Sequence, residues 1–221
     1  MRSLSLLSLG CGVLVVSLMA AFQPDGPPTA APQAKPVKYA GQKTCKSCHS
    51  GEDKSKVHEK WAGGPHAGAF ATLATAEAKK IAKEMGIDDA QKSPKCLKCH
   101  VTAFDVDKKL TKKIKHEDGV QCETCHGAGD NHKKARMKAA MKKDDSPPPA
   151  GEISVGRDAA LCKKCHNEES PTYKPFCFKA SMKKIEHLDA RKKRSEEELK
   201  KLRETCTPDC EVCAKKDGDK K

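Results

Sequence analysis

The chain has 221 residues, with 13 cysteines but only one Trp, two Tyr and five Phe. Charged residues make up 33% and hydrophobic residues 37%, so side chains alone cannot build an ordinary core for a domain of this size. Either most of the chain is disordered or something other than side chains fills its interior. The net charge of +13 by itself favours nucleic acid or an anionic surface as partner, but the cysteine motifs argue against that interpretation.

The N-terminus resembles an export signal. Arg2 is followed by an apolar run over residues 4–22, and a stretch rich in Pro and Ala comes after it. We therefore predict a signal peptide over residues 1–22 and a linker over residues 23–38, and we expect the protein to be exported. The apolar run is about 19 residues long, so an uncleaved membrane anchor is the alternative.

One short pattern, Cys-x-x-Cys-His, occurs four times and is the attachment signature of c-type haem. Two thiols on one turn form thioethers with the haem vinyl groups, and the His binds the iron from the proximal side. We predict four covalently bound haem c groups. The attachment residues are Cys45, Cys48, Cys96, Cys99, Cys122, Cys125, Cys162 and Cys165, and the proximal iron ligands are His49, His100, His126 and His166.

Zinc binding and disulfide chemistry are the competing interpretations of these motifs. Paired Cys-x-x-Cys units bind structural zinc, but zinc does not explain a His at the same place after every pair. Thiol redox motifs usually occur singly within a βαβ pattern, which this sequence lacks, and a disulfide framework does not need the His. Haem attachment therefore explains more of the pattern than either alternative.

Four haems also account for the shortage of core residues, because each is a large apolar plate against which short helices can pack. We predict a mainly α fold over residues 39–190, with short helices and loops wrapped around four closely packed haems and little or no sheet. The apo chain should not fold. Haem propionates would lower the net charge to about +4 after removal of Arg2, so a nucleic-acid partner is not needed.

Three segments between and after the motifs have readable local patterns. Apolar residues from Phe70 to Met85 recur at helical spacing, which predicts one amphipathic helix ending at Gly86. The Pro-rich residues 144–151 predict a linker or extended turn. Residues 191–204 predict an exposed helix within a charged tail over 191–221.

Cys11 lies in the predicted signal peptide, and four further cysteines lie outside the haem motifs: Cys177, Cys206, Cys210 and Cys213. In an oxidising compartment an even number favours two disulfides, with the pairing open and metal binding as the alternative. No His follows the last Cys-x-x-Cys pair, so we do not expect a fifth haem there.

Five histidines remain as candidate distal ligands, enough to give every haem iron a sixth ligand. They are His58, His66, His116, His132 and His187. Methionine is the other candidate ligand, but Met85 fits the core of the predicted helix, and Met137 and Met141 lie on a Lys-rich stretch. We expect histidine at the distal positions.

Several segments together resemble the tetrahaem cytochrome c-554 family. They are Tyr-Ala-Gly at 39–41, Trp-Ala-Gly-Gly-Pro-His at 61–66, the second motif with Val-Thr-Ala-Phe at 101–104, and the third motif inside 119–129. The resemblance extends over about residues 39–188. It implies a mainly helical fold around stacked haems and a periplasmic electron carrier in nitrogen-compound oxidation.

The resemblance also implies distal ligands at three positions. The resemblance implies that His66 binds the iron of the third haem, His132 that of the fourth and His187 that of the first. The second haem, on His100, would then be five-coordinate. His58 and His116 are additional to the family pattern, and His116, just ahead of the third motif, could close the second haem.

Two functions follow from these alternatives. A carrier would pass electrons from haem to haem between redox partner proteins, without nucleic acid and without a membrane unless the N-terminal segment is uncleaved. An enzyme would use the open iron at His100 on nitric oxide or hydroxylamine. Asp105, Asp107 and Glu117 are acid-base candidates only by position, so we favour the carrier. A haem-based sensor or a subunit of a larger redox complex is a third class.

Overall fold

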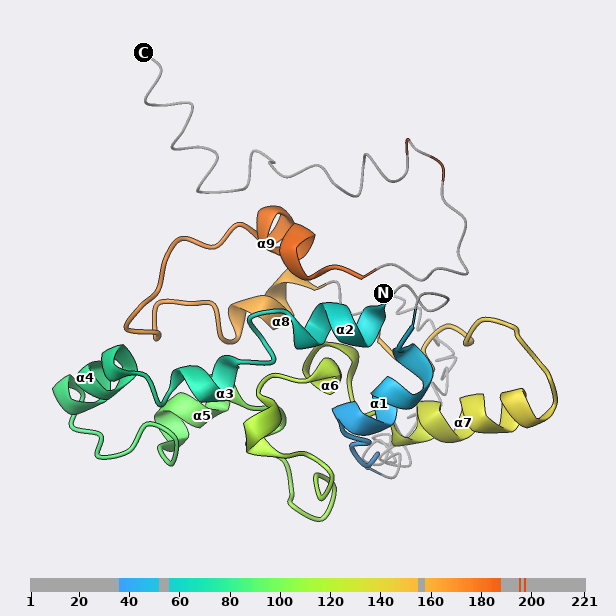
Figure 1. The fold of residues 1–221 in the computed structure, drawn as a ribbon, viewed down its shortest axis with the longest axis horizontal. Coiled ribbons are helices and arrows are strands. Elements are labelled where there is room, and N and C mark those ends of the chain that lie inside the picture. Colours follow the sequence, from blue (N-terminus) through green and yellow to red (C-terminus); the bar gives the residue numbers. More distant parts are fainter. Residues whose placement is uncertain (1–35, 52–55, 155–157, 188–194, 196, 198–221) are drawn as a thin grey trace, which may run out of the picture. The chain divides into compact units, whose positions relative to one another are not determined.

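The computed structural model describes residues 36–51, 56–154 and 158–187, together with 195 and 197, and Figure 1 shows their path. Within these residues there are helices and loops but no strand, which confirms the mainly α prediction. None of the described helices is long and apolar enough to cross a membrane. The predicted signal peptide, most of the linker, the charged tail and Cys206, Cys210 and Cys213 lie outside the described residues.

The helices are short. They are α1 (Gln42–His49), α2 (Val57–Ala62), α3 (Ala69–Thr72), α4 (Ala76–Glu84), α5 (Pro94–His100), the 3-10 helix η2 (His116–Asp118), α6 (Cys122–His126), α7 (Asp130–Met141), α8 (Ala159–Lys163) and α9 (Phe178–Ile185). Of these, α1, α5, α6 and α8 carry residues of the four motifs in chain order. Contacts join α1 to α2 and α6, and α3 to α5 and η2.

The single helix predicted from Phe70 to Met85 is wrong, because the chain forms α3 and α4 with a turn between them. Two threonines break the helix at this turn. Thr72 Oγ1 donates to the Ala69 carbonyl at 2.7 Å, and Thr75 Oγ1 accepts from the Ala78 amide at 3.2 Å as the N-cap of α4. The predicted end is confirmed, since α4 stops at Glu84 and Gly86 follows with a φ of +66°.

The apolar core is small, as the composition predicts. One cluster of buried residues lies around α3, α4 and α5, consisting of Leu73, Ala82, Ala90, Leu97 and Val101. Elsewhere the two largest fully buried side chains are polar, namely Gln121 and Thr102. Apolar packing therefore stabilises the region of α3, α4 and α5. Hydrogen bonds must hold much of the rest of the described chain together.

Gln121, just ahead of the third motif, joins three separate segments. Its side-chain oxygen accepts from the Gln42 amide at 3.0 Å, and its side-chain nitrogen donates to the Lys115 carbonyl at 3.1 Å. Its own amide donates to Thr102 Oγ1 at 2.6 Å, beside the second motif. The start of α1 and the end of the second motif are thereby fixed to the third motif.

The carboxylate of Glu123 continues this polar junction inside α6. It is 3% exposed, and its two oxygens accept three backbone N–H groups, from Ala40, Gly41 and Gly129, each at 2.7 Å. A buried carboxylate with this many donors is well satisfied, and hydrogen bonds to a charged acceptor are stronger than neutral ones. We call residues Gly119 to Glu123 the polar junction.

Replacing Glu123 with Gln should lower the free energy of unfolding of the haem-loaded protein by about 2 kcal/mol or more, because one amide oxygen replaces two charged acceptors. Denaturant unfolding followed by circular dichroism measures the change. Glu117→Gln is the matched control, since Glu117 is exposed, and it should stay within about 0.5 kcal/mol of the parent. Equal effects for the two variants would contradict the role assigned to Glu123.

Candidate functional site

A single cavity of about 2700 Å³ reaches all four Cys-x-x-Cys-His motifs. All eight motif cysteines and all four motif histidines lie in its wall, which is mostly apolar. A pocket for one small ligand usually measures about 300–1,000 Å³, so this cavity has room for more than one. The Pro-rich residues 144–151 have no helix, as predicted, but they line the cavity and so do more than link two motifs.

Each motif lies on the last turn of a helix or on the turn that continues it. We number the motif sites 1 to 4 in chain order by their histidines, His49, His100, His126 and His166. In sites 1 to 3 the His is the last residue of its helix, α1, α5 or α6. In site 4, α8 ends at Lys163, and the His166 amide continues the turn with a 3.0 Å bond to the Cys162 carbonyl. The prediction that both thiols share a turn with the His is confirmed at all four.

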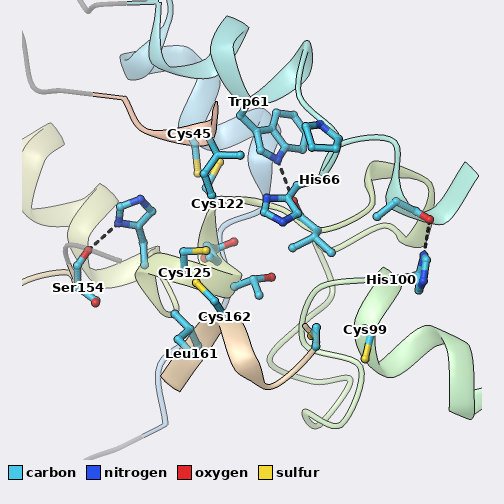
Figure 2. A pocket seen from close by; sticks show the side chains of 18 of the residues that line it. Cys45, Trp61, His66, Cys99, His100, Cys122, Cys125, Ser154, Leu161 and Cys162 are labelled. Atoms are coloured by element: carbon cyan, nitrogen blue, oxygen red, sulfur yellow. Dashed lines mark hydrogen bonds between the residues drawn. The ribbon is translucent and has the colours of Figure 1, made fainter. Parts of the chain in front are cut away.

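The eight motif cysteines are free thiols, and six of them meet in pairs from different sites. Cys45 of site 1 shares a hydrogen bond with Cys122 of site 3, and Cys99 of site 2 shares one with Cys165 of site 4. Figure 2 shows Cys125 of site 3 beside Cys162 of site 4. These contacts place the attachment points in the spatial order 1, 3, 4, 2.

Burial favours the protonated form of three of these thiols. It raises the pKa of Cys125 and of Cys162, and burial together with Cys99 raises the pKa of Cys165 to about 12. In the coupled pair, the shared hydrogen bond raises the pKa of Cys45 and lowers that of Cys122. Metal thiolates and reactive redox cysteines need a lowered pKa, so this setting does not favour either alternative. No group of three or more metal-binding side chains occurs among the described residues.

Cys177, outside the motifs, is 6% exposed and disulfide-bonded. None of the motif cysteines is its partner, because all eight are free. The expectation of disulfides among the remaining cysteines is therefore supported at Cys177, and the pairing stays a prediction.

Three of the motif histidines face a second histidine across the cavity. The ring centroids are 6.2 Å apart for His49 and His132, 6.1 Å for His66 and His166, and 5.8 Å for His126 and His187. No such ring pair involves His100 in the part of the chain that the structure describes. The structure therefore brings together three pairs and leaves one motif histidine without a facing imidazole.

The spacing of these pairs fits one metal ion between two imidazoles. With a metal–nitrogen distance of about 2.0 Å on each side, two rings on opposite faces of a metal have centroids about 6 Å apart. Burial lowers the pKa of His66 and of His166, and an imidazole must be neutral to bind a metal. The thiol pairs, the cavity and the histidine pairs all suit covalently attached haem.

Hydrogen bonds at Nδ1 orient several of these rings. His100 Nδ1 lies 2.6 Å from the Ala69 carbonyl, and His126 Nδ1 lies 2.6 Å from the Ser154 carbonyl, both drawn in Figure 2. His132 Nδ1 lies 2.7 Å from a carboxylate oxygen of Glu152. A proton held on Nδ1 leaves Nε2 as the nitrogen available to iron.

The histidine pairing that the family resemblance implied is wrong for all three distal residues. His66 faces His166 of site 4 instead of site 3, His132 faces His49 of site 1 instead of site 4, and His187 faces His126 of site 3 instead of site 1. Backbone hydrogen bonds position two of these histidines. The Val120 amide bonds the His66 carbonyl at 2.9 Å, and the Asp130 amide bonds the Lys38 carbonyl at 3.1 Å, which fixes the start of α7 beside the segment that leads into α1.

Neither additional histidine lies against His100. His58 is 8% exposed, its Nε2 is 2.8 Å from Gln42 Oε1, and its ring packs on Trp61 at 5.3 Å. His116 is exposed, lies between the rings of Phe70 and Phe104, and is not part of the cavity wall. The prediction that one of them could close the second site is therefore not supported.

The structure also shows where the remaining candidate residues lie relative to the cavity. Met85, expected in a helix core, is 40% exposed and lines the cavity at the end of α4. The acid-base candidates Asp105, Asp107 and Glu117 are exposed and lie outside the cavity wall. Glu123 and Glu152 have no signal in the sequence, because a single acidic residue without a repeated spacing forms no recognisable pattern.

The repeated motif and the short helices around one cavity are typical of multihaem c-type cytochromes. The model of the family described as "Cytochrome c554 and c-prime" matches residues 44–127, which contain sites 1 to 3. Cytochrome c-554 of Nitrosomonas europaea is 28% identical over 178 residues, covering 75% of this chain and 71% of the relative. The predicted resemblance to cytochrome c-554 is thereby confirmed.

Among solved structures, the reduced state of cytochrome c554 from Nitrosomonas europaea is similar to this chain. The match covers 84% of this chain and 98% of that one at 24% identity, with a TM-score of 0.46.

Gly119→Ala should disturb the pairing of His66 with His166. Gly119 has a φ of +63°, and a Cβ there would lie 2.6 Å from the carbonyl oxygens of both His66 and Ala67. Gly86→Ala is the matched control, because its φ is +66° and nothing lies within 4 Å of its Cβ. Both variants place Ala at a positive φ, which costs about 1–2 kcal/mol. Gly119 also has a ψ of −141°, so its backbone lies in a region essentially restricted to Gly.

Electron paramagnetic resonance of the oxidised, haem-loaded variants measures the outcome. Only Gly119→Ala should convert the haem between His66 and His166 to the high-spin state, because its new Cβ clashes with the carbonyl of His66. Equal spectra for the two variants would contradict the assignment of His66.

Proposed function

We propose that the chain is an exported tetrahaem electron carrier. The observation that supports this most is the set of three facing histidine pairs inside one cavity that also receives eight motif thiols. When bound, haem c supplies an iron that takes up and releases one electron. The eight cysteines would hold the four groups as thioethers, and the paired histidines would supply both axial ligands at sites 1, 3 and 4.

The chain's own residues would make such transfer possible by placing the sites in contact. The thiol pairs Cys45–Cys122, Cys125–Cys162 and Cys99–Cys165 join sites 1, 3, 4 and 2 in that order. An electron entering at either end therefore has a continuous series of neighbouring sites. Histidine on both faces of three sites would exclude exogenous ligands there, which suits transfer without substrate chemistry.

Site 2 is the exception, and it supports a second candidate function. His100 is anchored by the Ala69 carbonyl, but no described histidine faces it. An iron there would have one open face, on which a small molecule such as nitric oxide or hydroxylamine could bind. The exposed positions of Asp105, Asp107 and Glu117 leave that reaction without an acid-base group from this set, so we favour the carrier.

The predicted signal peptide and the resemblance to cytochrome c-554 support a compartment and a metabolic role for this carrier. An export signal and c-type attachment motifs suit the periplasm, and the likeness to cytochrome c-554 favours a role in the oxidation of nitrogen compounds. Donor and acceptor would be redox proteins. Exposed lysines would steer the approach of acidic partners.

Reductive titration of the full-length, haem-loaded protein tests this function. The protein should carry four haems by mass, take up four electrons per chain and return them all to an oxidant. A double variant, Cys162→Ser with Cys165→Ser, should lose one haem and one electron of capacity. Sustained consumption of hydroxylamine or nitric oxide by the parent protein, at rates above those of free haem, would favour the enzyme instead.

A further inference from the structure

The acceptor at Nδ1 differs between the proposed haem ligands. His100 and His126 lie 2.6 Å from backbone carbonyl oxygens, which are neutral. His132 instead lies 2.7 Å from a carboxylate oxygen of Glu152. A charged acceptor draws the Nδ1 proton more strongly than a carbonyl does, so the His132 ring carries more negative charge than the other two.

The structure holds Glu152 firmly in this position. Its second oxygen accepts from Arg136 Nη2 at 2.9 Å, and its backbone amide donates to the Pro149 carbonyl at 3.1 Å. The side chains of His132 and Glu152 are each only 14% exposed, so water screens their interaction weakly. Arg136 Nη1 also donates to the Ser146 carbonyl at 3.1 Å, which ties the loop after α7 back to the helix.

Residues of the Pro-rich segment therefore do more than connect sites 3 and 4. Arg136 and His132 lie one turn apart on α7, and the returning chain brings Glu152 against both. This arrangement fixes the ring of His132, which lies 6.2 Å from the ring of His49 between centroids, and leaves Nε2 as its nitrogen available to iron.

We propose that Glu152 is a positioning residue that lowers the reduction potential of site 1. The inference rests on the proposed function, because it takes His132 and His49 as the axial ligands of one haem iron. A more negative imidazole stabilises ferric iron more than ferrous iron, and the balance of the two states sets the potential. Reduction of that iron takes up one electron, supplied by the redox partner, and no bond of the chain forms or breaks.

The position of site 1 gives this tuning a consequence for direction. Site 1 touches site 3 through Cys45 and Cys122, and it lies at one end of the series 1, 3, 4, 2. Electrons move spontaneously from low to high potential. A lowered potential at this end therefore favours electron transfer out of site 1 toward site 3 over the reverse transfer.

Glu152→Gln in the full-length, haem-loaded protein tests the proposal. Gln keeps the size and still offers an oxygen to Nδ1, but it removes the charge. A potentiometric titration followed by optical spectra should show one haem potential shifted upward and three unchanged. Electron paramagnetic resonance of the oxidised protein should show altered g-values for one low-spin haem, with that haem still six-coordinate.

Glu117→Gln is the matched control, since it also removes one carboxylate charge but at an exposed position outside the cavity wall. It should leave all four potentials and the g-values unchanged. Glu152→Asp separates the hydrogen bond from charge alone, because the shorter side chain keeps its charge near Arg136 and withdraws its oxygen from His132. It should shift the same potential upward.

The outcomes distinguish this proposal from the proposed function. A parent protein without four haems, or without low-spin signals from three of them, would overturn the proposed function. A parent with both, in which Glu152→Gln retains four haems but leaves every potential in place, would overturn the role of Glu152 alone. A shift with Gln but none with Asp would overturn the hydrogen bond as its cause. If Glu152→Gln loses haem, Glu152→Asp decides the same question.

Discussion

The structure depends on a large, mostly apolar cavity that its own side chains do not fill. With a cavity of about 2700 Å³ and one small apolar cluster beside α3, α4 and α5, the described chain buries little hydrocarbon against hydrocarbon. The hydrophobic effect usually supplies most of the driving force for folding. In our account four haems provide the missing apolar surface, and their attachment makes folding and cofactor binding one event.

Hydrogen bonds position the motifs around that cavity. The polar junction joins the start of α1, the end of the second motif and the carbonyl of His66 through Gln121, Glu123 and Val120. Buried polar groups stabilise a fold only when their partners are all in place, so such a junction specifies one arrangement more sharply than apolar contacts would. One of these contacts, from Val120 to His66, also positions the distal histidine that faces His166.

The sequence predicts the local chemistry better than the spatial pairing. Four identical motifs predict the attachment residues and their turns because each lies within five consecutive residues. Poor core composition predicts the cavity. The partners of His66, His132 and His187 depend on contacts between residues far apart in the chain, such as Val120 with His66, which leave no local pattern. The break at Thr72 and Thr75 was missed because apolar spacing continues across it, while the threonine hydroxyls compete for the backbone.

The central proposal is that a facing histidine closes three haem sites, whereas no histidine among the described residues closes site 2. A carbon monoxide difference spectrum of the fully reduced protein, scaled to total haem, tests it most directly, because carbon monoxide binds only ferrous iron with a free axial position. The account predicts one carbon monoxide per four haems. Binding to none, or to two or more, would contradict the ligation described for His100 and for the three histidine pairs.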